Sequence, residues 1–345
     1  MSDEYLWNRS GRPDEEVETL ERLLGQLRYR HRPWPASQQG VPVSRGASPR
    51  RWHRHAVPVA LAASVALLVA WTWMARFDRP ASPGAAGTTA ASWTVTPMSG
   101  APRLAQREID ADVRVPADSW LETDAGSTAR LRAGAVGTVE IGPGSRLRVL
   151  AAGGGEHRLA LVKGTLDAFI WASPGQFFVE TPSAVAVDLG CAYRLEVDEQ
   201  GAGRLRVTAG WVGFKLNGRE SLVPSGAVCA TRPGHGPGTP HFEDATPAFQ
   251  KALAAVDEGA GSVDQGALER LLREARRRDA LSLWHLLPRL DRASAARVYD
   301  RLAALAPPPP EASRELVLAG ERGALDAWWD TLGFGPVSRF REWMR

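Results

Sequence analysis

The chain has 345 residues, which is enough for two folded domains and a further short segment. Its formal net charge is only +3, and its basic residues, nearly all arginine, are scattered along the chain instead of being gathered on one element. This pattern gives no support for direct binding of nucleic acid.

Residues 1–55 contain one predicted amphipathic helix followed by a flexible tether. The helix begins after Pro13 with acidic residues and ends with basic ones, an arrangement that suits the helix dipole. Its apolar side chains recur every three or four residues and form one stripe: Val17, Leu20, Leu23, Leu24 and Leu27. A helix this short cannot bury the stripe against itself, so we expect a partner protein, a second copy or the membrane surface to cover it.

Residues 56–75 carry no charged side chain, and as a helix they would span roughly 30 Å, the thickness of a bilayer's hydrocarbon core. Trp52 precedes the segment, and Trp71 and Trp73 lie near its end, where tryptophan favours the headgroup level. We therefore predict a single transmembrane helix. A long buried core helix is the alternative.

The flanks of this segment predict its orientation, because more arginines precede it than follow it closely. The positive-inside rule then places residues 1–55 in the cytoplasm and the bulk of the chain in the periplasm. A cleaved signal peptide would need a much shorter leading segment. We expect a single-pass protein of the inner (cytoplasmic) membrane.

A flexible linker, residues 76–91, leads to a predicted β region, residues 92–230. Short runs of alternating apolar and polar residues, separated by glycine-rich turns, predict its strands. These runs are Ala129–Arg132, Thr138–Ile141, Arg146–Leu150, His157–Val162, Phe177–Glu180, Val185–Leu189, Tyr193–Val197, Arg204–Thr208 and Trp211–Leu216. We expect stacked short strands that form either a solenoid-like roll or a sandwich.

Four motifs in this region, in order, resemble the FecR domain. They are KGTL at 163–166, FVETP at 178–182, VDLGCAY at 187–193 and VTAGWV at 207–212. The resemblance covers about residues 95–225. The residues within the motifs have structural roles: the glycines suit positive φ at turns, and Pro182 has no N–H to donate along a strand edge.

This resemblance implies a transmembrane regulator that binds an extracytoplasmic-function sigma factor inside the cell and receives a signal in the envelope. The stripe of residues 17–27 would then be the face that binds the sigma factor. No cysteine lies in residues 1–55, which excludes a zinc site of the kind seen in some anti-sigma domains. The alternative is a membrane-anchored envelope β scaffold that binds protein or glycan and has no transcriptional role.

The two cysteines, Cys191 and Cys229, both fall on the side that we expect to be oxidising. Cys191 stands where the FecR domain usually has threonine. A disulfide between the two cysteines would tie the end of the β region to its middle. Two buried free thiols are the alternative, since cysteine is a common small core residue.

After a second predicted linker, residues 231–247, the apolar period becomes helical over residues 248–345. Asp291 is a predicted N-cap, and the prolines at 307–310 separate the later, shorter helices. We expect a helical bundle that packs on the β region. The alternative is a module that binds an envelope protein, with Trp328 and Trp329 as its anchors.

Nothing in the sequence indicates an enzyme, and we expect no catalytic residue, no cofactor and no metal site. No GxSxG, HExxH or Walker A motif is present, and no GxGxxG motif occurs in the right context. Cys191 or a serine could in principle pair with a histidine. However, His235 and His241 lie in a segment rich in glycine and proline, and His285 is expected to pack at the boundary of a helix.

Overall fold

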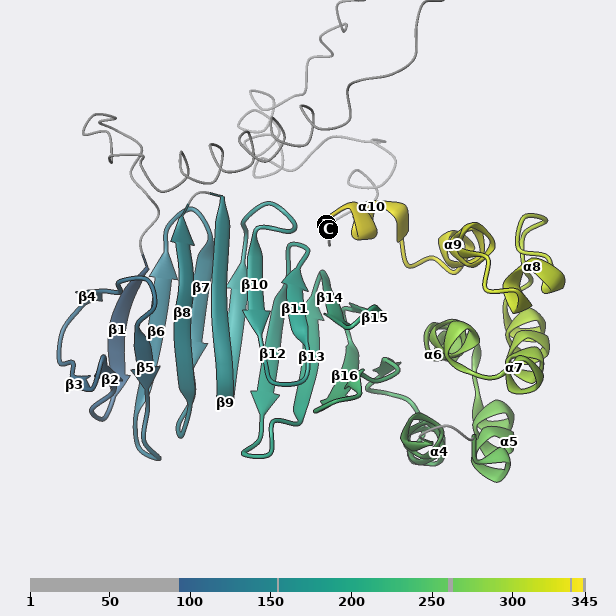
Figure 1. The fold of residues 1–345 in the computed structure, drawn as a ribbon, viewed down its shortest axis with the longest axis horizontal. Helices are drawn as coiled ribbons and strands as arrows, with labels where there is room; N and C mark the ends of the chain where they lie inside the picture. Colours follow the sequence, from purple (N-terminus) through teal and green to yellow (C-terminus); the bar gives the residue numbers. More distant parts are fainter. Residues whose placement is uncertain (1–92, 154, 260–262, 336, 344–345) are drawn as a thin grey trace, which may run out of the picture. The chain divides into compact units, whose positions relative to one another are not determined.

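The computed structural model describes residues 93–153, 155–259, 263–335 and 337–343. These residues, drawn in colour in Figure 1, all belong to one compact unit, Gly84–Arg345. The predicted amphipathic helix within residues 1–55, the predicted span at 56–75 and the linker at 76–91 lie outside the described residues. None of the helices in the described part of the chain combines the length and the apolar character that crossing a bilayer requires.

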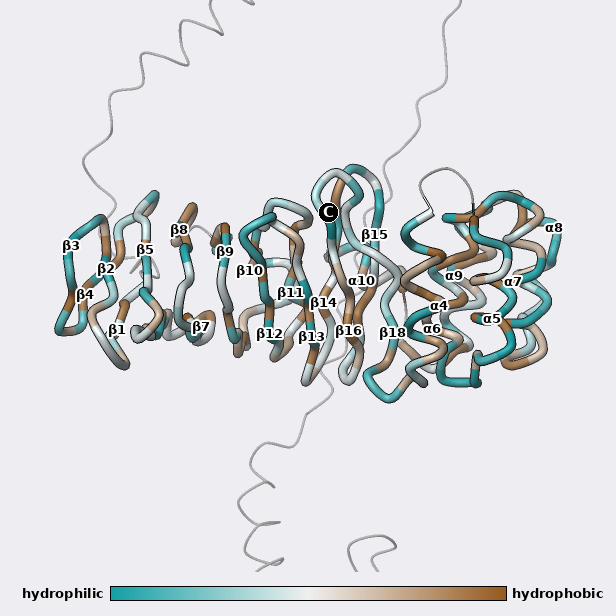
Figure 2. Tube along the Cα trace, turned by 90° about the horizontal axis from the view of Figure 1, so that it is seen from below, coloured by the Kyte–Doolittle hydropathy of each residue, from teal (hydrophilic) through white to brown (hydrophobic). Residues whose placement is uncertain are grey.

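The β region consists of two layers that share one long strand, β9 (Glu156–Ile170). The first layer holds, in order, β4 (Val113–Arg114), β1 (Thr94–Ser99), β6 (Thr128–Ala133), β7 (Gly137–Ile141), the second half of β9, β12 (Ala192–Val197), β13 (Gly203–Ala209) and β16 (Ala227–Arg232). Two short strands, β17 (Gly236–Pro237) and β18 (His241–Phe242), both pair with β16. Figure 2 shows β1, β7, β12 and β13 in one row and β5, β8 and β10 in the other.

The second layer is built in the same way. It holds β3 (Arg107–Glu108), β2 (Arg103–Leu104), β5 (Trp120–Glu122), β8 (Arg146–Gly153), the first half of β9, β10 (Phe177–Glu180), β11 (Val185–Asp188), β14 (Trp211–Leu216) and β15 (Arg219–Pro224). Apart from the parallel pair β9–β10, every strand pairing among the described residues is antiparallel. The chain passes back and forth between the layers, so neighbouring strands of one layer often come from different hairpins.

Gly164 lies where β9 passes from one layer to the other. Its φ of +100° is open to glycine and strained for other residues. A β-carbon on Gly164 would fall within 3.0 Å of the backbone of Ser145. The hydroxyl of Ser145 accepts a hydrogen bond from the Thr165 N–H at 2.9 Å, which holds the neighbouring chain close to this bend.

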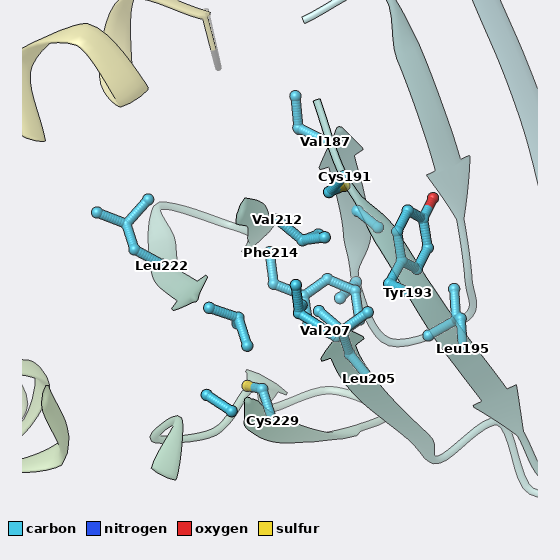
Figure 3. Close-up of a cluster of buried hydrophobic side chains, with 14 of the residues drawn as sticks. Val187, Cys191, Tyr193, Leu195, Leu205, Val207, Val212, Phe214, Leu222 and Cys229 are labelled. Carbon is cyan, nitrogen blue, oxygen red and sulfur yellow. The ribbon is translucent and has the colours of Figure 1, made fainter. Parts of the chain in front are cut away.

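The core lies between the two layers, where the alternating side chains of both meet. Figure 3 shows the part under the later strands, where Phe214 of the second layer belongs to the same buried cluster as side chains from β12 and β13. The labelled side chains, none more than 5% exposed, are Val187, Cys191, Tyr193, Leu195, Leu205, Val207, Val212, Phe214, Leu222 and Cys229.

Each strand predicted from alternation falls on an observed strand, and the predicted bounds of β10 and β14 agree with the structure. The prediction of a second linker at residues 231–247 is corrected by the structure. Thr231 pairs with Pro237 and Val228 with His241, so residues 231–242 continue the first layer. The glycines and prolines there form tight turns within the sheet, one of them at Gly236 with φ +74°.

The C-terminal region is helical, as predicted, and follows the last strands at one end of the layers in Figure 1. Its elements are α4 (Pro247–Glu258), α5 (Gln265–Glu274), η1 (Arg277–Asp279), α6 (Ala280–Leu286), η2 (Leu287–Arg289), α7 (Arg292–Leu305), α8 (Arg314–Leu318), α9 (Arg322–Thr331) and α10 (Val337–Trp343). Asp291 caps α7, as predicted: its carboxylate accepts from the N–H groups of Ala293 and Ser294.

The helices pack against the end of the β region through aromatic side chains. Trp211 of β14 lies 5.9 Å from Trp329 and 4.7 Å from Phe340, measured between ring centroids. Trp328 and Trp329 are fully buried, and their indole N–H groups donate to carbonyls of the helical region itself. The expectation of a bundle packed on the β region is therefore confirmed, and these two tryptophans are core residues instead of exposed anchors.

Candidate functional site

The site residues predicted from the sequence fall into two groups. The stripe at residues 17–27 lies outside the described residues. Cys191 and Cys229 are free and buried, and Figure 3 shows them at opposite ends of the core cluster. The thiol of Cys191 donates to the carboxylate of Asp188, whereas that of Cys229 donates to the carbonyl of Gly238 at 3.3 Å. The predicted disulfide is thus absent, and the alternative of two buried thiols describes the structure.

Asp188 ends β11 and Cys191 lies in the turn before β12, and both belong to one of the FecR-like motifs. The carboxylate of Asp188 also accepts from the Gly190 N–H at 2.7 Å and is 1% exposed. Burial raises the pKa of Asp188 to about 7. Burial, followed by the charge of Asp188, raises the pKa of Cys191. A thiol held in the protonated state is a poor nucleophile, so this pair has a structural role.

Two of the described histidines, His157 and His285, pack inside the fold. His157 is buried against Trp93, with ring centroids 6.0 Å apart, and burial lowers its pKa. His285 packs at the boundary between helix α6 and strand β15, as predicted: its Nε2 accepts from the Leu222 N–H at 3.0 Å, so its Nδ1 carries the proton and donates to Leu281. Within the described ranges, no cluster of three or more His, Cys, Asp or Glu side chains could hold a metal ion.

A cavity of about 460 Å³ lies between strand β15 and the helices, and it is the candidate site of this structure. It is rich in arginine. Its lining consists of Asn217, Gly218, Arg219, Glu220, Leu222, Trp284, His285, Pro288, Arg289, Gly320, Arg322, Leu325 and Arg341. The helical elements α6, η2, α9 and α10 and the β14–β15 hairpin all contribute residues to it.

Two of the cavity arginines are paired with carboxylates. Arg341 contacts Glu220 at 3.4 Å and forms a close ion pair with Asp326. Arg219 lies 3.5 Å from Asp257 of α4. These pairs hold α10 and α4 to the β15 strand.

The other two arginines have no carboxylate among their hydrogen-bond partners in the described part of the chain. Arg289 donates to the Thr239 hydroxyl at 3.0 Å, the Ser221 hydroxyl at 2.8 Å and the Glu220 carbonyl at 2.6 Å, all neutral acceptors. Burial, and then the charge of Arg219, lowers the pKa of Arg289 to about 10. Arg322, the first residue of α9, is exposed and takes part in no ion pair between described residues.

Sequence reasoning did not find this cavity. Its arginines are spread from residue 219 to residue 341, with no common spacing, and they come together only because the helices fold back on β15. Of the residues that line the cavity, only His285 was singled out by the sequence, as a polar residue expected at the boundary of an apolar helix.

Comparison with known proteins concerns the β region. Residues 119–213 match the family model described as FecR protein, a stretch that runs from β5 into β14. No curated protein matches the chain. Two crystal structures, at 1.65 and 2.50 Å, of a protein from Parabacteroides distasonis described as a candidate anti-sigma factor are similar at 14% identity and a TM-score of 0.32.

In both cases the similarity covers 39% of this chain and 64% of the other, so the chain spans about two thirds of the length of those structures. At that TM-score the likeness adds nothing to the assignment. The family match instead falls on the stretch that holds the four sequence motifs. Residues 119–213 of this chain are a FecR domain.

Proposed function

We propose that this chain is a transmembrane regulator of FecR type. It binds an extracytoplasmic-function sigma factor through its N-terminal helix and senses an envelope signal through its β region. The observation that carries the proposal is the FecR domain at residues 119–213. The proposal includes no catalytic role; both buried thiols and His285 form hydrogen bonds within the fold.

The stripe supplies the contact to the sigma factor. Its side chains are Val17, Leu20, Leu23, Leu24 and Leu27. An amphipathic helix laid into an apolar groove is a common recognition mode, with anchors at the spacing that this stripe has. A helix of this length is marginal alone, which gives the stripe a reason to bind another surface.

The proposal places residues 56–75 across the inner membrane, with the N-terminus in the cytoplasm and the FecR domain in the periplasm. The motivation is the uncharged segment and the excess of arginine before it. A reporter that fluoresces only in the cytoplasm should be bright when fused after Ser48 and dark when fused after Arg345. The reverse pattern, or brightness in both fusions, would contradict this topology.

The test of the function uses the full-length chain and a double substitution in the stripe, Leu20→Asp with Leu24→Asp. Two charges on the apolar face should abolish co-purification with the sigma factor from solubilised membranes, because each charge would be buried without a partner. The control adds the same charges away from the stripe, Thr19→Asp with Gln26→Asp, and should keep the sigma factor bound.

Binding that survives the stripe substitution would show that the stripe is not the contact. If no sigma factor co-purifies with the unmodified chain, the envelope scaffold becomes the better description of the protein. Equal loss in both double variants would point to helix disruption and would also count against a specific stripe.

A further inference from the structure

The cavity between β15 and the helices places the half-buried guanidinium of Arg289 beside the apolar side chains of Leu222, Trp284 and Leu325. We propose that it binds a small organic anion, a carboxylate or phosphate carried on a compact apolar body. The identification of this anion as the envelope signal rests on the regulatory function proposed above. The binding of the anion does not, and it can be measured on the purified chain alone.

Arg289 is the first reason. Its guanidinium is held in place by three hydrogen bonds to neutral oxygens, from Thr239, Glu220 and Ser221. The carboxylate of Asp257 acts on this charge through the Thr239 hydroxyl, which donates to it at 2.7 Å. No carboxylate among the described residues hydrogen-bonds Arg289 directly, and a bound anion would supply that contact. The three bonds also fix the guanidinium in advance, so little side-chain freedom is lost when a ligand binds.

Arg322 and the start of α9 are the second reason. Gly320, Arg322 and Leu325 bring the N-terminal turn of α9 to the cavity. The side chain of the N-cap residue, Glu321, makes no capping hydrogen bond. The first N–H groups of a helix have no partner within the helix and carry partial positive charge, so this end of α9 adds to the attraction for an anion.

The apolar side chains of the cavity indicate which kind of anion it would bind. Leu222, Trp284 and Leu325 line the cavity beside the arginines. Its volume of about 460 Å³ lies within the roughly 300–1,000 Å³ that is usual for small-molecule sites. His285, whose pKa is held well below its usual value by burial and by the charge of Arg289, stays neutral, so the cationic groups of the cavity are its arginines. An anion with an apolar body therefore suits the cavity better than inorganic phosphate does.

The other two cavity arginines form ion pairs with carboxylates of the protein. Arg341 is engaged by Glu220 and Asp326, and Arg219 by Asp257, so their charges are balanced within the protein. They tie α10 and α4 to β15 and α10 to α9, and they leave Arg289 and Arg322 to the ligand. A ligand held by these two residues would bridge η2 and α9.

The experiment titrates the full-length chain, purified in mild detergent, by calorimetry. The probes are phenyl phosphate, benzoate, inorganic phosphate and uncharged benzyl alcohol. Phenyl phosphate or benzoate should bind, more weakly as salt rises, and benzyl alcohol should not. Whichever of the two bound more tightly would identify the headgroup. Stronger binding of inorganic phosphate than of either would overturn the role of the apolar wall.

Variants at the exposed Arg322 test the site without disturbing the core. Arg322→Gln should lower the affinity for the tighter-binding organic anion at least about tenfold, as expected for a lost charge-assisted hydrogen bond. Arg322→Lys should keep most of that affinity. Arg270→Gln, an exposed change on α5 outside the cavity, should have no effect. Unchanged binding in Arg322→Gln, or no binding of either organic anion to the unmodified chain, would overturn the proposal. Because no sigma factor is present, neither result bears on the sigma contact.

Discussion

Asp188 makes the stability of the FecR domain depend on pH in a direction opposite to that of most carboxylates. The side chain is 1% exposed, and its partners are the Gly190 N–H and the Cys191 thiol, with no cation among them. Burial raises its pKa from 3.8 to about 7. The folded state therefore binds the proton more tightly than the unfolded state does.

The sign and size of the effect follow from that difference. The stabilisation from protonated Asp188 is fully present below pH 3.8 and is lost as pH rises to about 7. At about 1.4 kcal/mol per pH unit, this interval corresponds to roughly 4 kcal/mol of unfolding free energy. Asp188→Asn removes the titration. The amide oxygen can still accept from Gly190, but the amide N–H₂ meets the weak acceptor Cys191, at a cost of about 1 kcal/mol.

We therefore expect the variant to be less stable than the unmodified chain only below about pH 4, within about 1 kcal/mol of it at pH 5, and more stable at pH 8 by about 3 kcal/mol after that cost is subtracted. Urea unfolding in detergent, followed by tryptophan fluorescence at pH 5, 6.5 and 8, measures the unfolding free energy of the full-length chain and of the variant. Asp112→Asn, at an exposed aspartate, is the control and should follow the unmodified chain. A variant that is less stable by the same amount at every pH would refute the reasoning, because it would show that Asp188 is ionised in the fold.

Three further changes test the fold itself, each by the same urea titration at pH 7. Gly164→Ala should destabilise the chain by about 3 kcal/mol or more, because positive φ and the Ser145 backbone both oppose a β-carbon; a loss under about 1 kcal/mol would contradict the rigid bend. His285→Phe should cost about 2 kcal/mol, since the buried Leu222 N–H loses its acceptor, and a neutral outcome would mean that this N–H finds another partner. Tyr193→Phe should be neutral or stabilising by about 1 kcal/mol, because the buried hydroxyl has no hydrogen-bond partner among the described residues, and a clear loss would reveal one.

The strands could be predicted where apolar and polar residues alternate over four or more positions, because one face of each strand packs between the layers. Leu205 and Val207 in β13 point inward while Arg204 and Arg206 point outward, and this pattern is visible in the sequence. The strands before residue 119 escaped prediction because most have only two or three residues, too few to show a period. The short strands β17 and β18 escaped because the glycines and prolines around them resemble a linker until their pairing with β16 is seen.

The candidate site could not be predicted, for a different reason. Arg289 follows a proline in a short 3₁₀ helix and Arg322 starts α9, and neither position carries a local signal of function. Their shared environment depends on how η2 and α9 dock on β15. Sequence patterns report which face of one element is apolar, whereas a cavity is defined by faces of several elements that meet.

The position of the cavity relative to the FecR domain connects the two proposals. The family match ends at residue 213 in β14, and Trp211 in that strand packs on Trp329 and Phe340 of the helical region. The next strand, β15, pairs with β14 along its length and forms one wall of the cavity. On its other side β14 pairs with β11, where Val212 faces Asp188. An anion between β15 and α9 would thus lie one strand from the last strand of the FecR domain and two strands from its buried carboxyl. The helices and the domain share a continuous packed edge, and a ligand that tightens this edge acts on the domain directly.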